Sequence, residues 1–262
     1  MKRIALVSVF TIMVIGAADV VAAPITVTSA LRKVVVGGQA EPFLGANSPS
    51  TAVGGSFIDT ATQTTSTDFG LVDTSADQNS NVDAGAGLFT GTGSVGVSFN
   101  ARQQYGFFAN SIFDIHFDLA TSYDYSLSGG VNANNDGGRA ESLLQIFDAS
   151  SNSIITFDAI ANNDSFNPFA ALTSSGTLAA GSYELLVETI FDNCVNSQIS
   201  TGVDNACGPS PGSAMGTTND VTNFAFTFQL TEAATPVPEP ATVALLGIGL
   251  AGLGLSRRKR AR

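Results

Sequence analysis

One strand-length alternation limits the fold of this chain more than any other feature. In the segment SIFDIHFDLA, residues 111–120, apolar and polar side chains take turns. The apolar members are Phe113, Ile115, Phe117 and Leu119. Because successive side chains of a strand point to opposite faces, this period of two predicts a strand with one buried face and one wet face.

Similar runs recur along the chain at intervals of about ten residues, with no helical period between them. They are a run from Tyr123 to Leu127 and the segments SLLQIFDA, NSIITFDA, GSYELLVETIFD and TNFAFTFQLTE. This spacing predicts an all-β antiparallel β-sandwich over residues 51–232, of the jelly-roll or immunoglobulin-like type. The stretch FNPFAALTSSGTLAAGSYELLVET resembles the late strands of jelly-roll modules in secreted proteins.

The first part of the chain is less regular. Residues 23–50 are expected to form a leading segment with a short strand at Val34–Val36. Residues 51–94 are rich in Thr, Ser, Gly and Asp, which predicts weak strands joined by long loops. A row of Thr60, Thr62 and Thr64 lies at strand spacing. Three such residues are too few for an ordered ice-binding array, so we interpret them as ordinary strand residues.

The charge of the body is strongly negative. Between Ala23 and Leu255 the net charge is −17, because that stretch holds 21 acidic residues and four basic ones. The four are Arg32, Lys33, Arg102 and Arg139. Such a surface repels phosphate backbones, which argues against nucleic-acid binding, and it attracts divalent cations.

The N-terminus has the layout of a secretory signal peptide. Lys2 and Arg3 precede an apolar run from Ile4 to Ala18, and small residues follow. A cut after Ala22 is predicted, so residues 1–22 are expected to form the signal helix and the remainder to be exported.

Two cysteines, Cys194 and Cys207, flank the polar segment VNSQISTGVDNA. An exported chain with two cysteines has one pairing available, so a disulfide is predicted. Closing such a loop stabilises the fold by about 3 kcal/mol in the loop-entropy model. A pair of free thiols is the alternative.

Oxygen-bearing side chains alternate in the segment DQNSNVDAG. They are Asp77, Asn79, Asn81 and Asp83. This pattern suits Ca²⁺, so Ca²⁺ is the one candidate cofactor. Val82 and Leu88 stand where an EF-hand loop has its Gly and its bidentate Glu, so a plain polar surface segment is the alternative.

The chain has one histidine, His116, between Asp114 and Asp118 on the predicted wet face. Such a row can hold a metal ion, but a zinc site normally has a second His or Cys, so we interpret it as a solvent-facing edge of the strand. No G-x-S-x-G elbow is present to support a serine hydrolase. Two G-x-G-x-x-G matches, GTGSVG and GIGLAG, lack the strand–loop–helix context of dinucleotide binding.

The C-terminal segment differs from the body. A Pro-rich linker, residues 233–240, precedes an apolar run predicted as a transmembrane helix over residues 241–256 and a basic cytoplasmic tail, residues 257–262. The uncharged part, residues 241–255, makes about 22 Å of helix, shorter than the roughly 30 Å hydrocarbon core. The cluster that stops translocation is Arg257, Arg258, Lys259 and Arg260.

This arrangement of Val-Pro-Glu-Pro, a short apolar helix and a terminal basic cluster closely resembles the PEP-CTERM sorting signal of Gram-negative bacteria. The resemblance implies that exosortase, a membrane transpeptidase-like enzyme, recognises Pro238, Glu239 and Pro240 and removes the tail. It also implies an intermediate tethered to the inner membrane, followed by the cell surface or the extracellular space. Proteins of this kind commonly accompany exopolysaccharide production.

The sequence therefore predicts an exported, non-catalytic surface or matrix protein that associates with exopolysaccharide or biofilm. A secreted polysaccharide hydrolase that uses paired carboxylates is the first alternative, although the chain has no Trp for sugar stacking. A structural protein that keeps its membrane anchor is the second.

Overall fold

Eleven β-strands make up the described part of this computed structural model, which comprises residues 24–38, 50–67, 70–100, 107–134, 139–162, 169–192 and 217–233. The strands are β1 (Ile25–Gly38), β2 (Gly55–Thr67), β3 (Gly70–Asp83), β4 (Leu88–Asn100), β5 (Phe107–Leu119), β6 (Tyr123–Asn132), β7 (Arg139–Asp148), β8 (Ser153–Asn162), β9 (Phe169–Leu178), β10 (Gly181–Asp192) and β11 (Thr217–Glu232). Those ranges contain no helix, and so none that could span a membrane. The predicted signal helix and C-terminal helix lie outside them.

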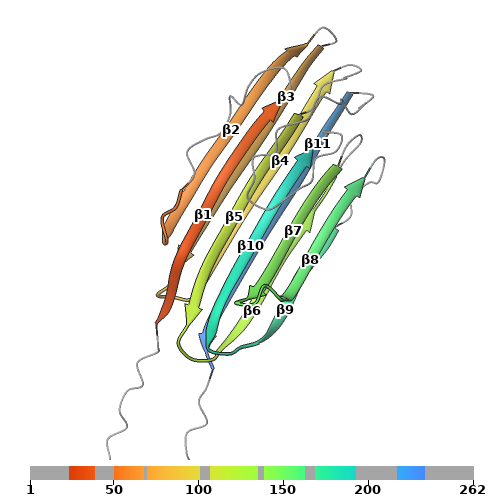
Figure 1. Cartoon of the computed structure of the whole chain (residues 1–262). Coiled ribbons are helices and arrows are strands. Elements are labelled where there is room, and N and C mark those ends of the chain that lie inside the picture. Colours follow the sequence, from red (N-terminus) through yellow and green to blue (C-terminus); the bar gives the residue numbers. More distant parts are fainter. Residues whose placement is uncertain are drawn as a thin grey trace, which may run out of the picture.

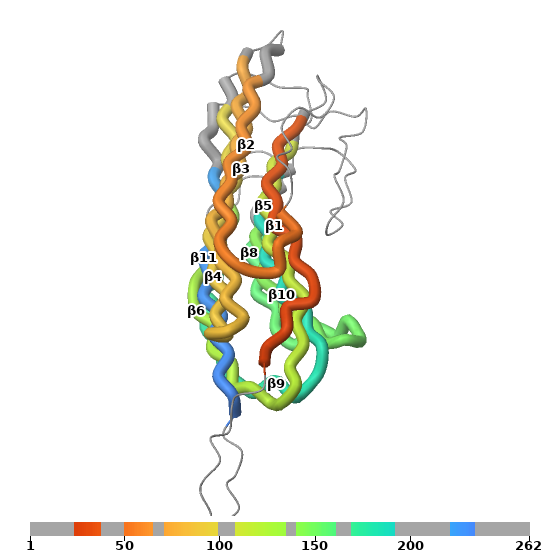
Figure 2. The backbone as a smooth tube through the Cα atoms, turned by 90° about the vertical axis from the view of Figure 1, so that its left-hand side faces the viewer, coloured from red at the N-terminus to blue at the C-terminus, as the bar shows by residue number. Residues whose placement is uncertain are grey.

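The strands form two antiparallel sheets (Figure 1). The five-stranded sheet has the order β1-β5-β10-β7-β8, and the six-stranded sheet has the order β2-β3-β4-β11-β6-β9. Figure 2, turned by 90°, shows them as two layers that face each other. The predicted all-β antiparallel fold is confirmed.

The core lies between the two sheets and follows from the period-two pattern. Phe113, Ile115 and Phe117 of β5 are fully buried. Phe113 meets Phe226 of the facing sheet with ring centroids 5.0 Å apart, and Phe117 meets Phe89 at 5.5 Å. Burying one such side chain contributes about 1.5–3 kcal/mol, so these cross-sheet aromatic contacts hold the layers together.

The chain passes repeatedly between the layers. Within the described residues, consecutive strands stay in one sheet only in the β2–β4 meander and the β7–β8 hairpin. All other connections cross to the opposite sheet. Sequence neighbours are therefore seldom neighbours in a sheet, and residues far apart in sequence meet side by side.

The first part of the chain is more regular than predicted. β1 pairs with β5 from Ile25 opposite Leu119 to Gly38 opposite Phe107, so residues 25–38 belong to the sandwich instead of preceding it. The long loops expected between residues 51 and 94 are wrong, because β2, β3 and β4 are continuous strands. Their inward side chains include Thr74, Gln78 and Ser80, all buried, so the apolar contrast that marks a strand is weak.

Arg32 is a buried cation in β1. Its guanidinium donates to the carbonyls of Gly55 at 2.7 Å, Ala52 at 2.9 Å and Gly54 at 3.3 Å. The guanidinium carbon also lies 5.6 Å from the centre of the Phe57 ring. These charge-assisted bonds fix the start of β2 against β1 and so join the edges of the two sheets.

Both ends of the described chain lie at one end of the sandwich (Figure 1). Ile25 pairs with Leu119, and Ala233 N donates to Ser122 O at 3.0 Å. The N-terminal and C-terminal segments are therefore attached at the same end, which leaves the outer faces of both sheets clear of the attachment points.

Candidate functional site

Small polar side chains make up most of the outer face of the six-stranded sheet, where the larger apolar side chains of Ile58, Leu71, Phe169 and Val221 are also exposed. β3 contributes Asp73, Ser75, Asp77, Asn79 and Asn81. β4 contributes Ser98, Ser94, Thr92 and Thr90, directly opposite these residues in the ladder, except that Ser75 is opposite Gly96. β11 continues the surface with Asn223, Thr227 and Gln229. Among its described side chains there is no Lys or Arg. The surface is rich in hydroxyl and amide groups, and its charges are acidic.

Two shallow hollows lie on this face. The first has a volume of about 390 Å³ and is bordered by side chains of β2, β3 and β4, with Thr64, Asp73 and Ser98 among them. The second, about 370 Å³, lies between Asn79, Thr92 and Thr227. Gly96 borders the first hollow and Gly129 the second.

Hydroxyl groups pair with the carboxylates of this face. Thr64 Oγ1 donates to Asp73 Oδ1 at 2.6 Å, and Thr177 Oγ1 donates to Asp124 Oδ1 at 2.7 Å. The Ser94 hydroxyl donates in the same way to the carboxylate of Asp77. These cross-strand bonds hold the polar side chains in fixed positions along the ladder.

The four predicted Ca²⁺ ligands do not converge. Asp77, Asn79, Asn81 and Asp83 follow one another at every second position of β3. A strand rises about 3.3 Å per residue, so the outermost two are about 20 Å apart. The Asp83 carboxylate accepts a bond from Ala86 N at 2.9 Å in the following turn. One ion cannot contact all four side chains, and Ca²⁺ binding by any of them stays a prediction.

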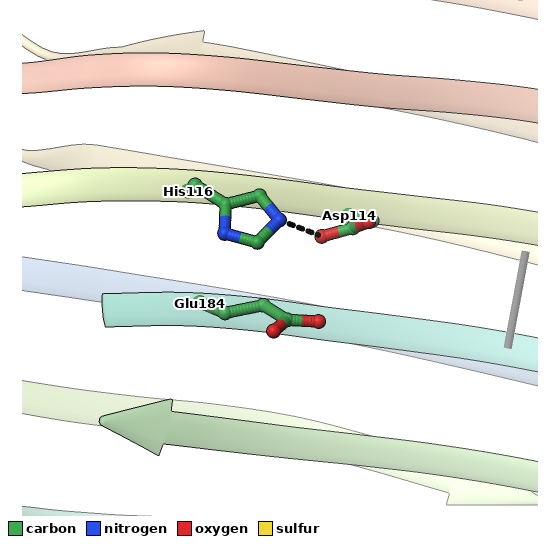
Figure 3. Close-up of side chains that lie close together, drawn as sticks. All are labelled: Asp114, His116 and Glu184. Atoms are coloured by element: carbon green, nitrogen blue, oxygen red, sulfur yellow. Dashed lines mark ion pairs between the residues drawn. The ribbon is translucent and has the colours of Figure 1, made fainter. Parts of the chain in front are cut away.

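A different cluster lies on the outer face of the five-stranded sheet. It consists of Asp114 and His116 of β5 and Glu184 of β10 (Figure 3). His116 and Glu184 are directly opposite each other in the ladder, and Asp114 is two residues before His116 on the same face. His116 Nε2 lies 3.6 Å from Asp114 Oδ1, and one potential ligand atom from each residue lies within 4.8 Å of the others.

The sequence placed two members of this cluster on one face of a strand but interpreted that face as solvent-facing. The alternation of β5 correctly placed Asp114 and His116 on one face, but the third member is Glu184 and not Asp118. Glu184 is separated from His116 by 67 intervening residues. Its proximity depends on the β5–β10 register, which the sequence pattern of either strand does not specify.

The environment of Asp114 disfavours its charged form. Burial raises the pKa of its carboxyl to about 6, His116 opposes that rise, and the charge of Glu184 adds to it. Asp114 Oδ1 is buried and has no hydrogen-bond partner among the described residues.

Farther along the same face, Glu188 is almost completely buried. Asn110 Nδ2 donates to Glu188 Oε1 at 2.7 Å, whereas Oε2 has no hydrogen-bond partner in the described part of the chain. Burial raises the pKa of Glu188 to about 7; the bond from Asn110 lowers it, and the charges of Glu141 and Asp114 raise it. Apolar side chains surround this carboxyl, since Ile112, Leu143 and Leu186 form a small buried cluster beside it.

The glycines of GTGSVG have a packing role. A Cβ added at Gly91 would lie 2.7 Å from the Phe226 ring, and one added at Gly93 would lie 2.5 Å from the Phe224 ring. Both rings are buried in the core. The motif therefore lies within β4 and makes room for aromatic side chains of the core.

The remaining predicted residues lie outside the described part of the chain. They are Cys194 and Cys207 of the expected disulfide, the motif Pro238, Glu239 and Pro240, and the basic residues Arg257, Arg258, Lys259 and Arg260. The disulfide stays a prediction.

Comparison with known proteins identifies the tail. The family described as the PEP-CTERM protein-sorting motif matches residues 236–259, which include Pro238, Glu239 and Pro240. The predicted sorting signal is therefore confirmed. It implies an exported chain with a membrane-associated sorting intermediate, processing by exosortase and an extracellular destination. No curated protein matches the chain.

Several solved structures share a partial likeness with the chain. The enzymatically active domain of tailspike protein 4 of bacteriophage CBA120 is 13% identical with a TM-score of 0.24; the match covers 66% of this chain and 19% of that one. Structures of infectious bursal disease virus, Gt and Gx strains, are each 11% identical, with TM-scores of 0.22 and 0.21. Those matches cover 90% and 92% of this chain and 86% and 91% of the viral chains. TM-scores this low carry no argument about fold or function.

Proposed function

We propose that this chain, which carries a PEP-CTERM sorting motif, is a non-catalytic matrix protein that binds an uncharged exopolysaccharide through the outer face of its six-stranded sheet. The sorting motif accounts for the destination of the chain. The observation that carries the binding proposal is the hydroxyl- and amide-rich surface of β3, β4 and β11.

The chemistry of that surface favours an uncharged polysaccharide. Sugar hydroxyls both donate and accept hydrogen bonds, and Ser, Thr, Asn and Asp side chains supply the matching groups. A polyanion would be repelled, because the described charges of the face are carboxylates without Lys or Arg. Each contact is weak on an open surface, so affinity for a long polymer would come from many repeated contacts.

The strand order supports assigning the sandwich to the jelly-roll type. Strands β4 to β11 form two groups of four, with the orders β4-β11-β6-β9 and β5-β10-β7-β8. Consecutive strands along the chain belong to alternate groups, except that β7 and β8 form a hairpin within one group. An immunoglobulin sandwich instead keeps its first two strands in one sheet. Jelly rolls include lectin domains, and this analogy of fold supports a glycan-binding role.

The test is binding of the full-length chain to arrayed polysaccharides, neutral polymers and acidic uronate polymers side by side. We expect binding to a neutral polymer. Thr92→Arg, which places a long charged side chain in the second hollow, should weaken that binding at least tenfold. The matched control is Thr156→Arg, an exposed strand position on the other sheet, which should bind like the wild type.

Two outcomes would contradict the proposal. One is a chain that binds no neutral polymer, or binds it equally well with Thr92→Arg. The other is the release of new reducing ends from the polysaccharide, which would favour the carboxylate-dependent hydrolase.

A further inference from the structure

We propose that Asp114, His116 and Glu184 form a binding site for a divalent transition-metal ion of the Zn²⁺ class on the outer face of the five-stranded sheet. The site is separate from the proposed polysaccharide surface, because the two lie on opposite outer faces of the sandwich. Either proposal can therefore fail without the other.

The distances within the cluster are close to those a metal needs. Zinc lies about 2.0–2.2 Å from nitrogen and carboxylate oxygen ligands, so neighbouring ligand atoms of a tetrahedral site are about 3.3–3.5 Å apart. His116 Nε2 and Asp114 Oδ1 are already 3.6 Å apart, and the three ligand atoms lie within 4.8 Å of one another. Side-chain adjustments of about 1 Å would close the site.

The backbone of the site is held by the centre of the sheet. β5 pairs with β1 on one side and β10 on the other, and β10 also pairs with β7. His116 and Glu184 are a direct cross-strand pair, and Asp114 is the next residue of β5 on that face. Thr28 Oγ1 of β1 also donates to the carbonyl of His116 at 3.2 Å. Ligands on a rigid ladder lose little freedom when they bind an ion.

The electrostatic balance of the cluster also favours a cation. Asp114 Oδ1 is buried without a hydrogen-bond donor among the described residues, and it points toward His116. A second carboxylate, Glu184, lies beside it, and Leu186 stands opposite Asp114 in the ladder. Two carboxylates beside an apolar side chain are stabilised when a cation binds, because the cation offsets their negative charge.

The ligand types select the class of metal. Calcium takes six to eight oxygen ligands and magnesium an octahedral oxygen shell, whereas imidazole suits zinc and the other first-row transition metals. Zinc takes both imidazole nitrogen and carboxylate oxygen ligands, so Asp114, His116 and Glu184 supply three of the four positions of a tetrahedral site and leave the fourth for a water molecule. The set has no second His, which most zinc sites have, so the expected affinity is lower than that of a site with two or three His ligands.

The test is calorimetric titration of the untagged full-length chain with Zn²⁺ alone and, separately, with Ca²⁺ alone. We expect one Zn²⁺ per chain and at least tenfold weaker binding of Ca²⁺. His116→Gln and Glu184→Gln should each weaken Zn²⁺ binding at least tenfold. The matched control is Asp118→Asn, which removes a carboxylate from the same strand outside the cluster and should keep the wild-type affinity.

Two further measurements keep the result decisive. Circular dichroism of each variant without metal should match that of the wild type, which shows that the loss is local. A Cys194→Ser/Cys207→Ser chain should bind Zn²⁺ like the wild type, which excludes the thiols. Wild-type affinity in the His116→Gln and Glu184→Gln chains, or loss of binding in the Cys double variant, would overturn the proposal.

Discussion

The outer faces of the two sheets come from the same alternating pattern but have opposite characters. On the six-stranded sheet, carboxylates such as Asp73 and Asp124 are exposed and each accepts a bond from a neighbouring hydroxyl. On the five-stranded sheet, Asp114 and Glu188 are partly or almost fully buried, and each has an oxygen without a donor among the described residues. The carboxylates of the first face are therefore exposed and paired with hydroxyl groups, whereas those of the second face are buried close together.

Period-two polarity therefore identifies the outer face of a sheet without specifying the chemistry of that face. Small exposed hydroxyl side chains leave a surface open to water, which suits weak contacts repeated along a polymer. Larger apolar neighbours such as Ile112 and Leu186 bury the acids between them and shift their pKa values. The five-stranded face therefore suits one localised ligand.

The largest expected effect concerns Glu188. Its pKa is about 7 in the folded chain against an ordinary value of 4.5, so the folded state binds this proton more tightly than the unfolded state. The contribution of Glu188 to stability is thus fully present below pH 4.5 and is lost as the pH rises through 7. Over this pH range, the loss in the free energy of unfolding due to Glu188 is on the order of 3 kcal/mol.

Glu188→Gln removes this proton equilibrium, and Gln can still accept the bond from Asn110. Denaturant unfolding gives the free energy of unfolding at pH 5 and at pH 8. Between these two pH values, the wild type should lose on the order of 3 kcal/mol more of this free energy than the variant does. Leu186→Met is a volume-conserving change on the same strand, and its free energy of unfolding should change between pH 5 and pH 8 as much as that of the wild type. An unchanged pH dependence in Glu188→Gln would remove the contrast between the faces.

A smaller effect is expected beneath the six-stranded face. Gly93→Ala places a methyl group 2.5 Å from the Phe224 ring, and overpacking of this kind costs about 1–3 kcal/mol. Thr92→Ser, one residue away on the outer face, should change the free energy of unfolding by less than about 0.5 kcal/mol. Equal losses for the two variants, measured by denaturant unfolding, would show that the outer position Thr92 is packed as tightly as the inner position Gly93.

Much of the fold could be predicted where apolar contrast is strong. The segment GSYELLVETIFD coincides with β10, and the inward residues of β5 were predicted correctly. The length and continuity of β2, β3 and β4 were not predicted, because the buried positions of this region include the polar residues Thr74, Gln78 and Ser80. β1 was shortened to Val34–Val36 because buried Arg32 interrupts its inward apolar row.

The candidate sites were harder to predict because they depend on register. The spacing of Asp77 to Asp83 suggested convergence, but a continuous strand spreads these side chains along its length. Glu184 joins His116 only through the β5–β10 ladder. By contrast, the sorting motif needs no tertiary structure, because its order, spacing and position are written in consecutive residues, and it was recognised from sequence alone.

Carboxyl footprinting of the full-length chain, with and without a bound neutral polysaccharide, shows directly which sheet face binds the polymer. A water-soluble carbodiimide labels exposed acids, and mass spectrometry reads the labelling at each position. We predict that the polysaccharide protects Asp73, Asp77 and Asp124 of the six-stranded sheet and leaves the labelling of Asp118 and Glu184 unchanged. Protection of Asp118 and Glu184 with full labelling of the other three would contradict the account.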